Sequence, residues 1–252
     1  MTAYIAYDNV FKKSGTFASS NEIAGGEKEN GIDWLLYDAW KPGVNGASSL
    51  SIELDNPQPC NYVAIAGHNL ADSANTRVAA QYSTDGNTWV DMVAELPILP
   101  DNQTIMLVVA DTPAVAHWRL YITNGISTNF ISHVCIGYAN GHSIMPPFTP
   151  PPEKNAGKPR HNLSVTGLYL GSDYDLAPFD VKFNVKFLAP AQMRAEFAPI
   201  LDHISQSPFF FQWDNERWPD EAAFCWLKKP PKNYRYDSTM HMTQSIQAVG
   251  VR

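Results

Sequence analysis

The sequence predicts a mainly β protein, in which an N-terminal antiparallel β-sandwich of the jelly-roll type is followed by a smaller C-terminal α+β domain. Three observations predict it. Short apolar runs broken by turn residues fill the first half, a Pro-rich stretch follows them, and a clear helical pattern occurs only in the second half. The 252 residues suffice for one large domain or two smaller ones.

The first part contains short strands and no convincing amphipathic helix. Residues 48–54 alternate between apolar and polar side chains, which is the pattern of a half-buried strand. Residues 61–67 form a continuous apolar run that ends at Gly67, as expected for a central strand. Asp85-Gly86 predicts a hairpin. The remaining strands are expected at 77–83, 88–93, 105–109, 117–122 and 130–138. About eight strands without βαβ alternation favour a sandwich.

Prolines concentrated in residues 146–159 predict a semi-rigid linker, because proline fixes φ and removes a backbone donor. We therefore expect a jelly-roll domain over residues 1–145 and an assembly domain over residues 160–252. The first 145 residues carry 6 Lys and Arg against 14 Asp and Glu, a net charge of −8. Residues 146–252 carry 12 against 11, a net charge of +1, so the two surfaces differ chemically.

The second domain begins with the clearest alternation in the chain. In residues 178–188, every second side chain is Phe or Val and the others are polar up to Lys186, which predicts an antiparallel strand with one solvated face. Residues 191–206 place apolar side chains at helical spacing, and Pro199 should kink or tighten that helix. Further strands are expected at 209–213, 222–227 and 243–251.

Composition and charge exclude several classes of partner. A net charge of −7 argues against nucleic acid, and no apolar run approaches the ~18 residues of a membrane span. The N-terminus has no secretory signal pattern, so we expect synthesis in the cytoplasm. Cys60, Cys135 and Cys225 form no CxxC pair and are interpreted as small core residues.

Motifs of known enzymes are absent. The sequence has no GxSxG, HExxH, Walker-type or GxGxxG pattern, and no histidines spaced for a zinc site. We therefore expect no enzyme activity, no cofactor and no catalytic metal; a structural calcium stays open, without supporting spacing. A sugar hydrolase using Asp33 and Asp38 as paired carboxylates is a minor hypothesis.

Five residues are candidates for ligand binding: Trp34, Asp38, Trp40, His68 and Asn69. Aromatic rings beside carboxylates suit sugars, which present C–H faces and hydroxyl groups. His68 and Asn69 follow an apolar strand, where both could bond a ligand hydroxyl. The structural alternative is that the aromatic residues seal the sandwich and that the two polar residues close their own loop. The sequence leaves both interpretations open.

An aromatic cluster in the second part is a candidate interface. Its members are Phe209, Phe210, Phe211, Trp213 and Trp218. A strand exposes alternate residues, so Phe210 or its neighbours must be covered by something, and a partner subunit is a natural cover. Packing within the chain's own core is the open alternative.

Two stretches carry family resemblances. The first is to the galactose-binding-like, discoidin-type jelly roll, which four segments together resemble. They are residues 40–54, residues 62–70, Ser83–Trp89 with its Asp85-Gly86 hairpin and Trp89, and Trp118–Ile122. That family carries a D-G-x-x-W hairpin and a late a-R-Y-x-R-L strand, whose place His117-Trp118-Arg119-Leu120 takes here. The resemblance covers most of residues 30–140 and implies a jelly roll; the sugar-binding loop residues of that family are not matched.

The second resemblance covers residues 160–172 and 208–214, which look like the C-terminal part of virion structural proteins of long-tailed bacteriophages. It implies a non-enzymatic component of a tail tip or baseplate, present in multiple copies in a symmetric assembly with other phage tail proteins. It also implies a place in the virion tail and a contribution to host-surface contact. Glycan recognition is not part of what it implies, and a host-surface glycan stays open as a partner. The alternative function is a carbohydrate-binding module that tethers its partner to a cell surface.

Overall fold

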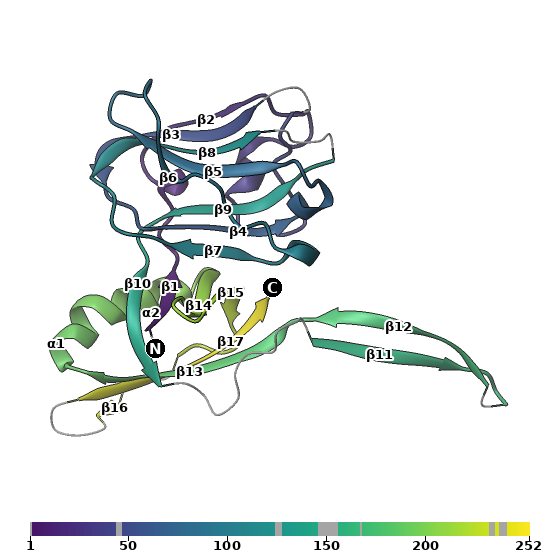
Figure 1. Ribbon diagram of the computed structural model, residues 1–252. Coiled ribbons are helices and arrows are strands. Elements are labelled where there is room, and N and C mark those ends of the chain that lie inside the picture. Colours follow the sequence, from purple (N-terminus) through teal and green to yellow (C-terminus); the bar gives the residue numbers. More distant parts are fainter. Residues whose placement is uncertain are drawn as a thin grey trace.

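The computed structural model confirms the mainly β fold with an antiparallel sandwich (Figure 1). It describes residues 2–43, 47–123, 128–145, 156–166, 168–231, 235–236 and 241–252. A sandwich of two sheets lies above a second β structure in Figure 1, and a two-stranded arm projects to one side. Among these residues, no helix has the length and apolar character needed to cross a bilayer.

The sandwich consists of a five-stranded sheet with the order β2-β3-β8-β5-β6 and a three-stranded sheet with the order β7-β4-β9. The first contains β2 (Gly15–Ser20), β3 (Ser48–Gln58), β8 (Val115–Thr123), β5 (Arg77–Ser83) and β6 (Val90–Val93). The second contains β7 (Ile105–Val108), β4 (Tyr62–His68) and β9 (Ile131–Gly137). The 3-10 turn η1 (Val10–Lys12) precedes β2, and η2 (Lys28–Gly31), η3 (Leu70–Asp72) and η4 (Pro100–Asn102) lie between sandwich strands.

Alternate residues of the two sheets form the sandwich core. Leu50 and Ile52 of β3, Trp118 of β8, and Val63 and Ile65 of β4 are all buried in one cluster. The expected hairpin is present, because β5 pairs with β6 across the loop that contains Asp85-Gly86. The period-two pattern thus selected the inward face of β3 correctly.

The second β structure is a closed antiparallel barrel. Its strands are β1 (Thr2–Ala6), β10 (Asn140–Met145), β13 (Phe179–Leu188), β14 (Phe209–Asp214), β15 (Trp218–Leu227), β16 (Arg235–Tyr236) and β17 (Met242–Val251). The order is β13-β10-β1-β14-β15-β17-β16, and β13 also pairs with β17, so the ring of hydrogen-bonded strands closes with β16 outside it. Closure leaves the ring without free edges.

A broken helix packs its apolar face on the barrel. It runs through α1 (Pro190–Gln192), a π-helical turn (Met193–Phe197) and α2 (Ala198–Ile204). Its buried side chains, which belong to the barrel core, are Met193, Phe197, Ile200, Leu201 and Ile204. The expected kink at Pro199 takes the form of the π turn before α2, where a proline without an N–H interrupts the α-helical bonding.

Strands from both ends of the expected jelly-roll domain, residues 1–145, are part of the barrel. β1 lies between β10 and β14, and β10 pairs with β13, so residues 2–6 and 140–145 are hydrogen-bonded into the sheet of the C-terminal part. The expected boundary at residue 145 assigns both strands to the sandwich instead. The difference arises because the partners of β1 lie more than 130 residues away, where local patterning carries no information.

An antiparallel arm made of β11 (Ala156–Leu163) and β12 (Tyr169–Ala177) extends away from the barrel (Figure 1). Residues 146–155 of the expected linker lie outside the described residues, and residues 156–159 belong to β11. Ser164 and Leu168 close its tip: the N–H of Ser164 donates to the Leu168 carbonyl at 2.8 Å, and the N–H of Leu168 donates to Ser164 Oγ at 3.0 Å.

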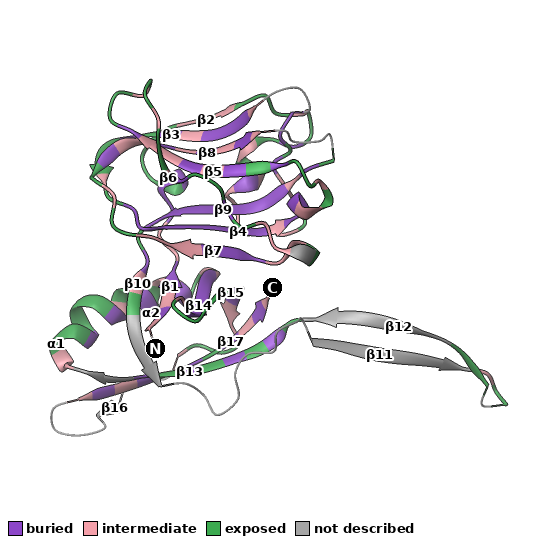
Figure 2. Ribbon diagram, viewed as in Figure 1, coloured by how far each residue is buried: buried purple, intermediate pink, exposed green. Residues whose placement is uncertain are grey.

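The outer face of the three-stranded sheet packs directly on the barrel. Tyr62, Ala64 and Ala66 of β4 share a buried cluster with Phe210 of β14 and Phe224 of β15. As a result, β4 and β9 are buried along nearly their whole length (Figure 2). We call this contact the seam. The molecule therefore has three layers, in which the five-stranded sheet is the one furthest from the barrel.

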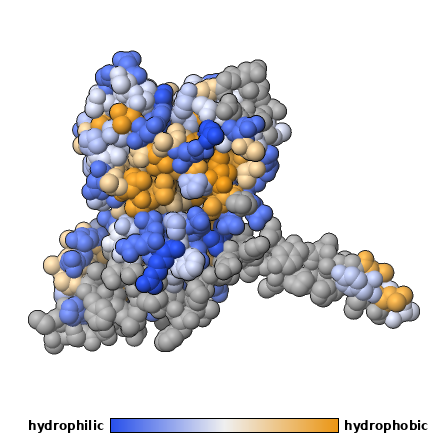
Figure 3. Space-filling model, viewed as in Figure 1, coloured by the Kyte–Doolittle hydropathy of each residue, from blue (hydrophilic) through white to orange (hydrophobic). Residues whose placement is uncertain are grey.

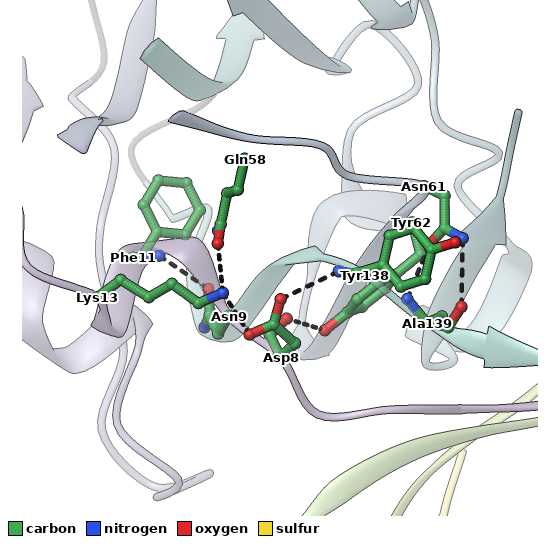
Figure 4. A network of polar contacts seen from close by, with 9 residues as sticks. All are labelled: Asp8, Asn9, Phe11, Lys13, Gln58, Asn61, Tyr62, Tyr138 and Ala139. Atoms are coloured by element: carbon green, nitrogen blue, oxygen red, sulfur yellow. Dashed lines mark hydrogen bonds and ion pairs between the residues drawn. The ribbon is translucent and has the colours of Figure 1, made fainter. Parts of the chain in front are cut away.

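Two chain crossings between sandwich and barrel are tied together beside the seam (Figure 4). Asn61 imitates a strand partner: its Nδ2 donates to the Ala139 carbonyl at 3.2 Å, and its Oδ1 accepts from the Ala139 N–H at 2.7 Å. The Tyr62 hydroxyl donates to the Asp8 carbonyl at 2.5 Å, and the Asp8 carboxylate accepts from the Tyr138 N–H at 3.3 Å. The bonds fix both crossings to β4.

Candidate functional site

The sequence-predicted ligand residues Trp40, His68 and Asn69 come together, but as internal contacts. Trp40 exchanges backbone hydrogen bonds with Ile131 at 2.9 and 3.0 Å, and its Nε1 donates to Ser19 Oγ at 3.1 Å. His68 is only 4% exposed, and its Nε2 lies 2.9 Å from the Gln103 carbonyl. The side chains of Trp40 and His68 therefore have their polar groups paired within the chain.

Asn69 closes the neighbouring loop. Its Nδ2 donates to the Thr128 carbonyl at 2.7 Å, and its Oδ1 accepts from the Phe130 N–H at 2.8 Å. This is the loop-closing arrangement that the sequence left as an alternative. Among the described atoms, both ends of the amide are thus engaged in holding residues 128–130.

The other two predicted ligand residues, Trp34 and Asp38, have different surroundings. Trp34 is half-buried in the seam, with its ring centroid 4.4 Å from that of His133 and the Lys12 Nζ 3.8 Å above it. Asp38 is half-exposed. Asp33, its suggested partner in hydrolysis, accepts the N–H of Leu35 at 2.9 Å on Oδ1. A ligand role for the five predicted residues stays a prediction; Trp34 and Asp38 are the two that remain half-exposed.

The aromatic cluster expected at an interface is mostly buried inside this chain. Phe209, Phe211 and Trp213 belong to the barrel core, and Phe210 lies in the seam under the sandwich. The partner that covers Phe210 is thus the chain's own three-stranded sheet. Trp218, at the start of β15, is 57% exposed. Only this last member could meet another molecule without rearrangement of the fold.

The three cysteines are free, buried residues, as expected for small core side chains. Burial raises the pKa of the Cys135 thiol to about 12 and raises the pKa of the Cys225 thiol as well. A protonated, enclosed thiol is a poor nucleophile. In the described ranges, no three His, Cys, Asp or Glu side chains are grouped closely enough to hold a metal ion.

A different group of side chains lies on the outer face of the five-stranded sheet. It comprises Gln81 of β5, Trp89 just before β6, Asp91 of β6, and His117, Arg119 and Tyr121 of β8. We call this group the Arg119 face. Alternation places it there, because Trp118, Leu120 and Ile122 of β8 point into the core. Gln81 lies directly opposite Arg119, and Asp91 lies opposite Gln81.

The Arg119 guanidinium is held by polar and aromatic contacts. Its Nε donates to Gln81 Oε1 at 2.7 Å, and Gln81 Nε2 donates to Asp91 Oδ1 at 2.6 Å. The guanidinium carbon lies 4.0 Å from the ring centroid of Trp89 and 4.5 Å from that of Tyr121, within the range of cation–π attraction. Partial burial lowers the pKa of Arg119, which is still fully protonated near neutral pH.

Several polar atoms of the Arg119 face have no partner among the described residues. They are the Nη atoms of Arg119, the indole N–H of Trp89, the Tyr121 hydroxyl and the ring nitrogens of His117. All four residues are half-exposed, so these groups face water. The polar groups of His68 and Asn69 are bonded within the chain, whereas the Arg119 face retains donors and acceptors that a ligand can bind.

Sequence reasoning missed this face although the signal was present. The Trp118-Arg119-Leu120-Tyr121 pattern assigns Arg119 and Tyr121 to one face of a strand. The hairpin at Asp85-Gly86 then brings Trp89 next to it. What the sequence did not give is the order β8-β5-β6, which places Gln81 between Arg119 and Asp91.

No family model and no curated protein matches this chain. Among solved structures, a CBM32 module of AlyQ in complex with 4,5-unsaturated mannuronic acid is similar, with 20% identity and a TM-score of 0.42 over 52% of this chain and 96% of that one. A Clostridium perfringens CBM32 module in complex with GalNAc-beta-1,3-galactose has 17% identity and a TM-score of 0.40 over 49% and 94% of the two chains.

A Ruminococcus gnavus GH29 fucosidase in complex with fucose is also similar, with 14% identity and a TM-score of 0.41 over 53% of this chain. This chain spans only 27% of the fucosidase. At these TM-scores the likenesses carry no argument about a ligand, a reaction or a partner of this chain. The resemblance of residues 160–172 and 208–214 to phage tail proteins stays a prediction.

Proposed function

We propose that this chain is a non-catalytic carbohydrate-binding protein and that its ligand lies on the Arg119 face. One observation carries the proposal: Trp89 and Tyr121 flank an immobilised Arg119, and the outward polar atoms of all three have no partner in the described chain. This is the alternative function that the sequence left open, at a place that the sequence did not identify.

The chemistry of the face favours a sugar over a protein partner. A sugar ring offers C–H groups to aromatic side chains and hydroxyl groups to donors and acceptors. Trp89 and Tyr121 supply the rings, while Arg119, His117 and Asp91 supply donors and an acceptor around them. The centre of a protein–protein interface is typically more apolar and depleted of charged side chains.

The layered architecture supports a tethering role. The five-stranded sheet is separated from the barrel by the three-stranded sheet, so the Arg119 face points away from the barrel. A ligand held there leaves the barrel and the arm free for attachment to a partner. The proposal therefore assigns recognition to one end of the molecule and anchoring to the other.

A glycan array followed by calorimetric titration tests the proposal. We expect millimolar or tighter binding to at least one glycan, and a loss of about fivefold or more for Trp89→Ala and Tyr121→Ala, since a lost stacking contact is worth roughly 1 kcal/mol or more. Trp218→Ala, an exposed tryptophan on the barrel, is the matched control. Binding that survives both substitutions, or release of reducing sugar from the bound glycan, would refute the proposal.

We also infer a second function, in which the arm assembles the chain with further copies of itself, as in the tail tip or baseplate that the sequence resemblance implies. The tip of the arm carries Val165, Leu168, Tyr169 and Leu170, which are 108%, 67%, 63% and 68% exposed. Figure 3 shows apolar residues at its described end. A lone two-stranded hairpin is only marginally stable in water, so a neighbouring subunit would stabilise it.

We infer that the partner of the arm tip is a second copy of this chain, because the apolar area of one tip is small. Four apolar side chains supply on the order of 400 Å², about half of what each partner contributes to a standard interface. A symmetric assembly doubles that area, since every copy both gives and receives an arm. Such a role would place the protein in a virion tail after synthesis in the host cytoplasm.

Light scattering after size-exclusion chromatography tests the second function. We expect a species larger than a monomer at micromolar concentration, and conversion to monomer by Leu168→Ser combined with Leu170→Ser. Leu35→Ser, which alters a 41% exposed leucine on the sandwich, should leave the assembly unchanged. If the parent protein were monomeric, or if the double substitution at the tip left the assembly intact, the second function would be refuted.

A further inference from the structure

We infer that the ligand of the Arg119 face carries an oxyanion group, as a uronate carboxylate or a sulfate ester does, and that Arg119 binds this group through its Nη atoms. The inference rests on the proposed carbohydrate-binding function and narrows it to acidic sugars. Its basis is an arginine that is fixed in place by neutral and aromatic partners while the end of its guanidinium has no acceptor among the described residues.

Two other described arginines, Arg77 and Arg252, differ from Arg119 in this respect. Arg77, also on β5–β8 sheet surface, forms an ion pair with Glu95, and Arg252 donates from Nη2 to the Asp220 carbonyl at 2.8 Å. In the part of the chain that is described, no carboxylate lies within ion-pair distance of Arg119. Its positive charge is therefore not neutralised by direct contact with any carboxylate that the structure describes.

The network around Arg119 orients its fork. Gln81 accepts from Nε and donates its own amide to Asp91, so the carboxylate of Asp91 is bound to Gln81 rather than to the guanidinium. Trp89 and Tyr121 restrict the guanidinium plane further. Little side-chain entropy then remains to be lost on binding, and the two Nη atoms present the paired N–H groups that match a planar or tetrahedral oxyanion.

Partial desolvation strengthens such a contact. Arg119 is half-buried by its aromatic neighbours, and that burial lowers the pKa of its guanidinium. A charge that has already lost part of its hydration gains more from an incoming anion than a fully exposed lysine would. The negative charge of Asp91 repels an anionic ligand. Removal of that charge should therefore change the affinity in the opposite direction to removal of the Arg119 charge.

Titration calorimetry of the full chain is performed with oligogalacturonate, with a sulfated galactan oligosaccharide and with a neutral galactan oligosaccharide of equal length. We expect at least one acidic oligosaccharide to bind about tenfold or more tightly than the neutral one at low salt. The affinity should fall several-fold at 0.5 M NaCl, because exposed charge pairs are screened. The two acidic probes tell a carboxylate from a sulfate ester.

Three variants locate the contact. Arg119→Gln should lose about tenfold or more in affinity for the acidic probe, Arg119→Lys should lose less, and Asp91→Asn should bind that probe more tightly without a matching gain for the neutral one. Arg77→Gln, in which an arginine already paired with Glu95 is removed, is the control and should bind normally. Unchanged thermal unfolding midpoints show that the variants are folded.

The possible failures are distinct. Equal or tighter binding of the neutral oligosaccharide would overturn this inference while the proposed carbohydrate-binding function stands. Acidic binding that Arg119→Gln does not weaken would overturn the assignment to Arg119. Absence of binding to all three probes and to the glycan array would overturn the proposed function and this inference together.

Discussion

Trp34 and His133 lie with their ring centroids 4.4 Å apart and their planes inclined by 32° in the seam between sandwich and barrel. His133 is fully buried, and Phe210 of β14 and Phe224 of β15 approach it from the barrel with centroid distances of 5.8 and 5.5 Å. Its Nδ1 lies 2.5 Å from the Asp33 carbonyl, while its Nε2 has no partner among described atoms. A neutral imidazole therefore sits where the two halves of the molecule meet.

We predict that this histidine makes the protein less stable in acid. Burial, helped by the nearby positive charge of Lys12, lowers the pKa of His133 to about 3. The unfolded chain, in which histidine has a pKa near 6.5, therefore binds a proton between pH 6.5 and 3 that the folded chain does not. The free energy of unfolding should thus fall as the pH falls below 6.5, by about 2 kcal/mol at pH 5.

Urea denaturation at pH 7 and at pH 5 measures this effect. Part of it should be absent from His133→Gln, because glutamine does not titrate. Trp218→Ala, which removes an exposed side chain on the barrel that does not titrate either, should retain the parent's full dependence. If His133→Gln and the parent lost the same stability between the two pH values, the buried imidazole would not be the responsible group.

Truncation of an aromatic side chain in the seam should be far more costly than truncation on the barrel surface. Phe224→Ala removes a side chain that is 2% exposed and contacts both layers, so we expect a loss of about 3 to 5 kcal/mol. Trp218→Ala, at the exposed start of the same strand, should cost less than about 1 kcal/mol. Equilibrium unfolding monitored by circular dichroism gives both values; similar losses would show that the seam is not tightly packed.

The paired hydrogen bonds of Asn61 should be important for the crossing at Ala139. Asn61→Ala leaves the N–H and the carbonyl of Ala139 without their partners in a buried place, which costs about 1 to 3 kcal/mol. Asn87→Ala, in the exposed loop between β5 and β6, is the comparison and should be nearly neutral. Hydrogen exchange of the Ala139 amide offers an independent reading, since faster exchange is expected only in the Asn61 variant.

Gly137 is required for the close approach of the two crossings. A Cβ at this position would overlap the carbonyl oxygen of Asp8, which is backbone and cannot turn away. Gly137→Ala should therefore cost about 3 kcal/mol. Gly25→Ala is the control, because nothing lies within 4 Å of its added Cβ and only its φ of +78° opposes the change, at about 1 to 2 kcal/mol. Thermal unfolding of both variants measures the two losses of stability. A larger loss for Gly25→Ala than for Gly137→Ala would contradict the proposed packing.

The sandwich strands could be predicted because their own residues specify them. β4 is a run of apolar residues between turn signals, and β3 and β8 alternate over residues 50–55 and 117–123, so each pattern reports burial directly. β2 shows no such pattern, because its residues are mostly exposed or half-exposed at the edge of a sheet. β1 is short and depends on β10 and β14, which no local window contains.

The site and the interface illustrate a second limit of local patterns. Every residue of β14 is buried, which shows that both of its faces are covered, but a sequence does not tell whether the cover is the same chain or another. In the same way, His68 and Asn69 look like ligand donors until the carbonyls of Gln103 and Thr128 are seen beside them. Arg119 gains its significance only from the neighbours that sheet order supplies.

The position of β1 has a consequence for the order of folding during synthesis. Thr2–Ala6 are synthesised before every strand of the sandwich, yet one of the strands that flank them is Phe209–Asp214, more than 200 residues later. At about 5 to 20 residues per second, the first strand waits roughly 10 to 40 s for that neighbour. The sandwich, whose pairings all lie within residues 15–137, can form during this delay, so strands β13 to β17 complete a barrel whose β1 strand was made before the sandwich.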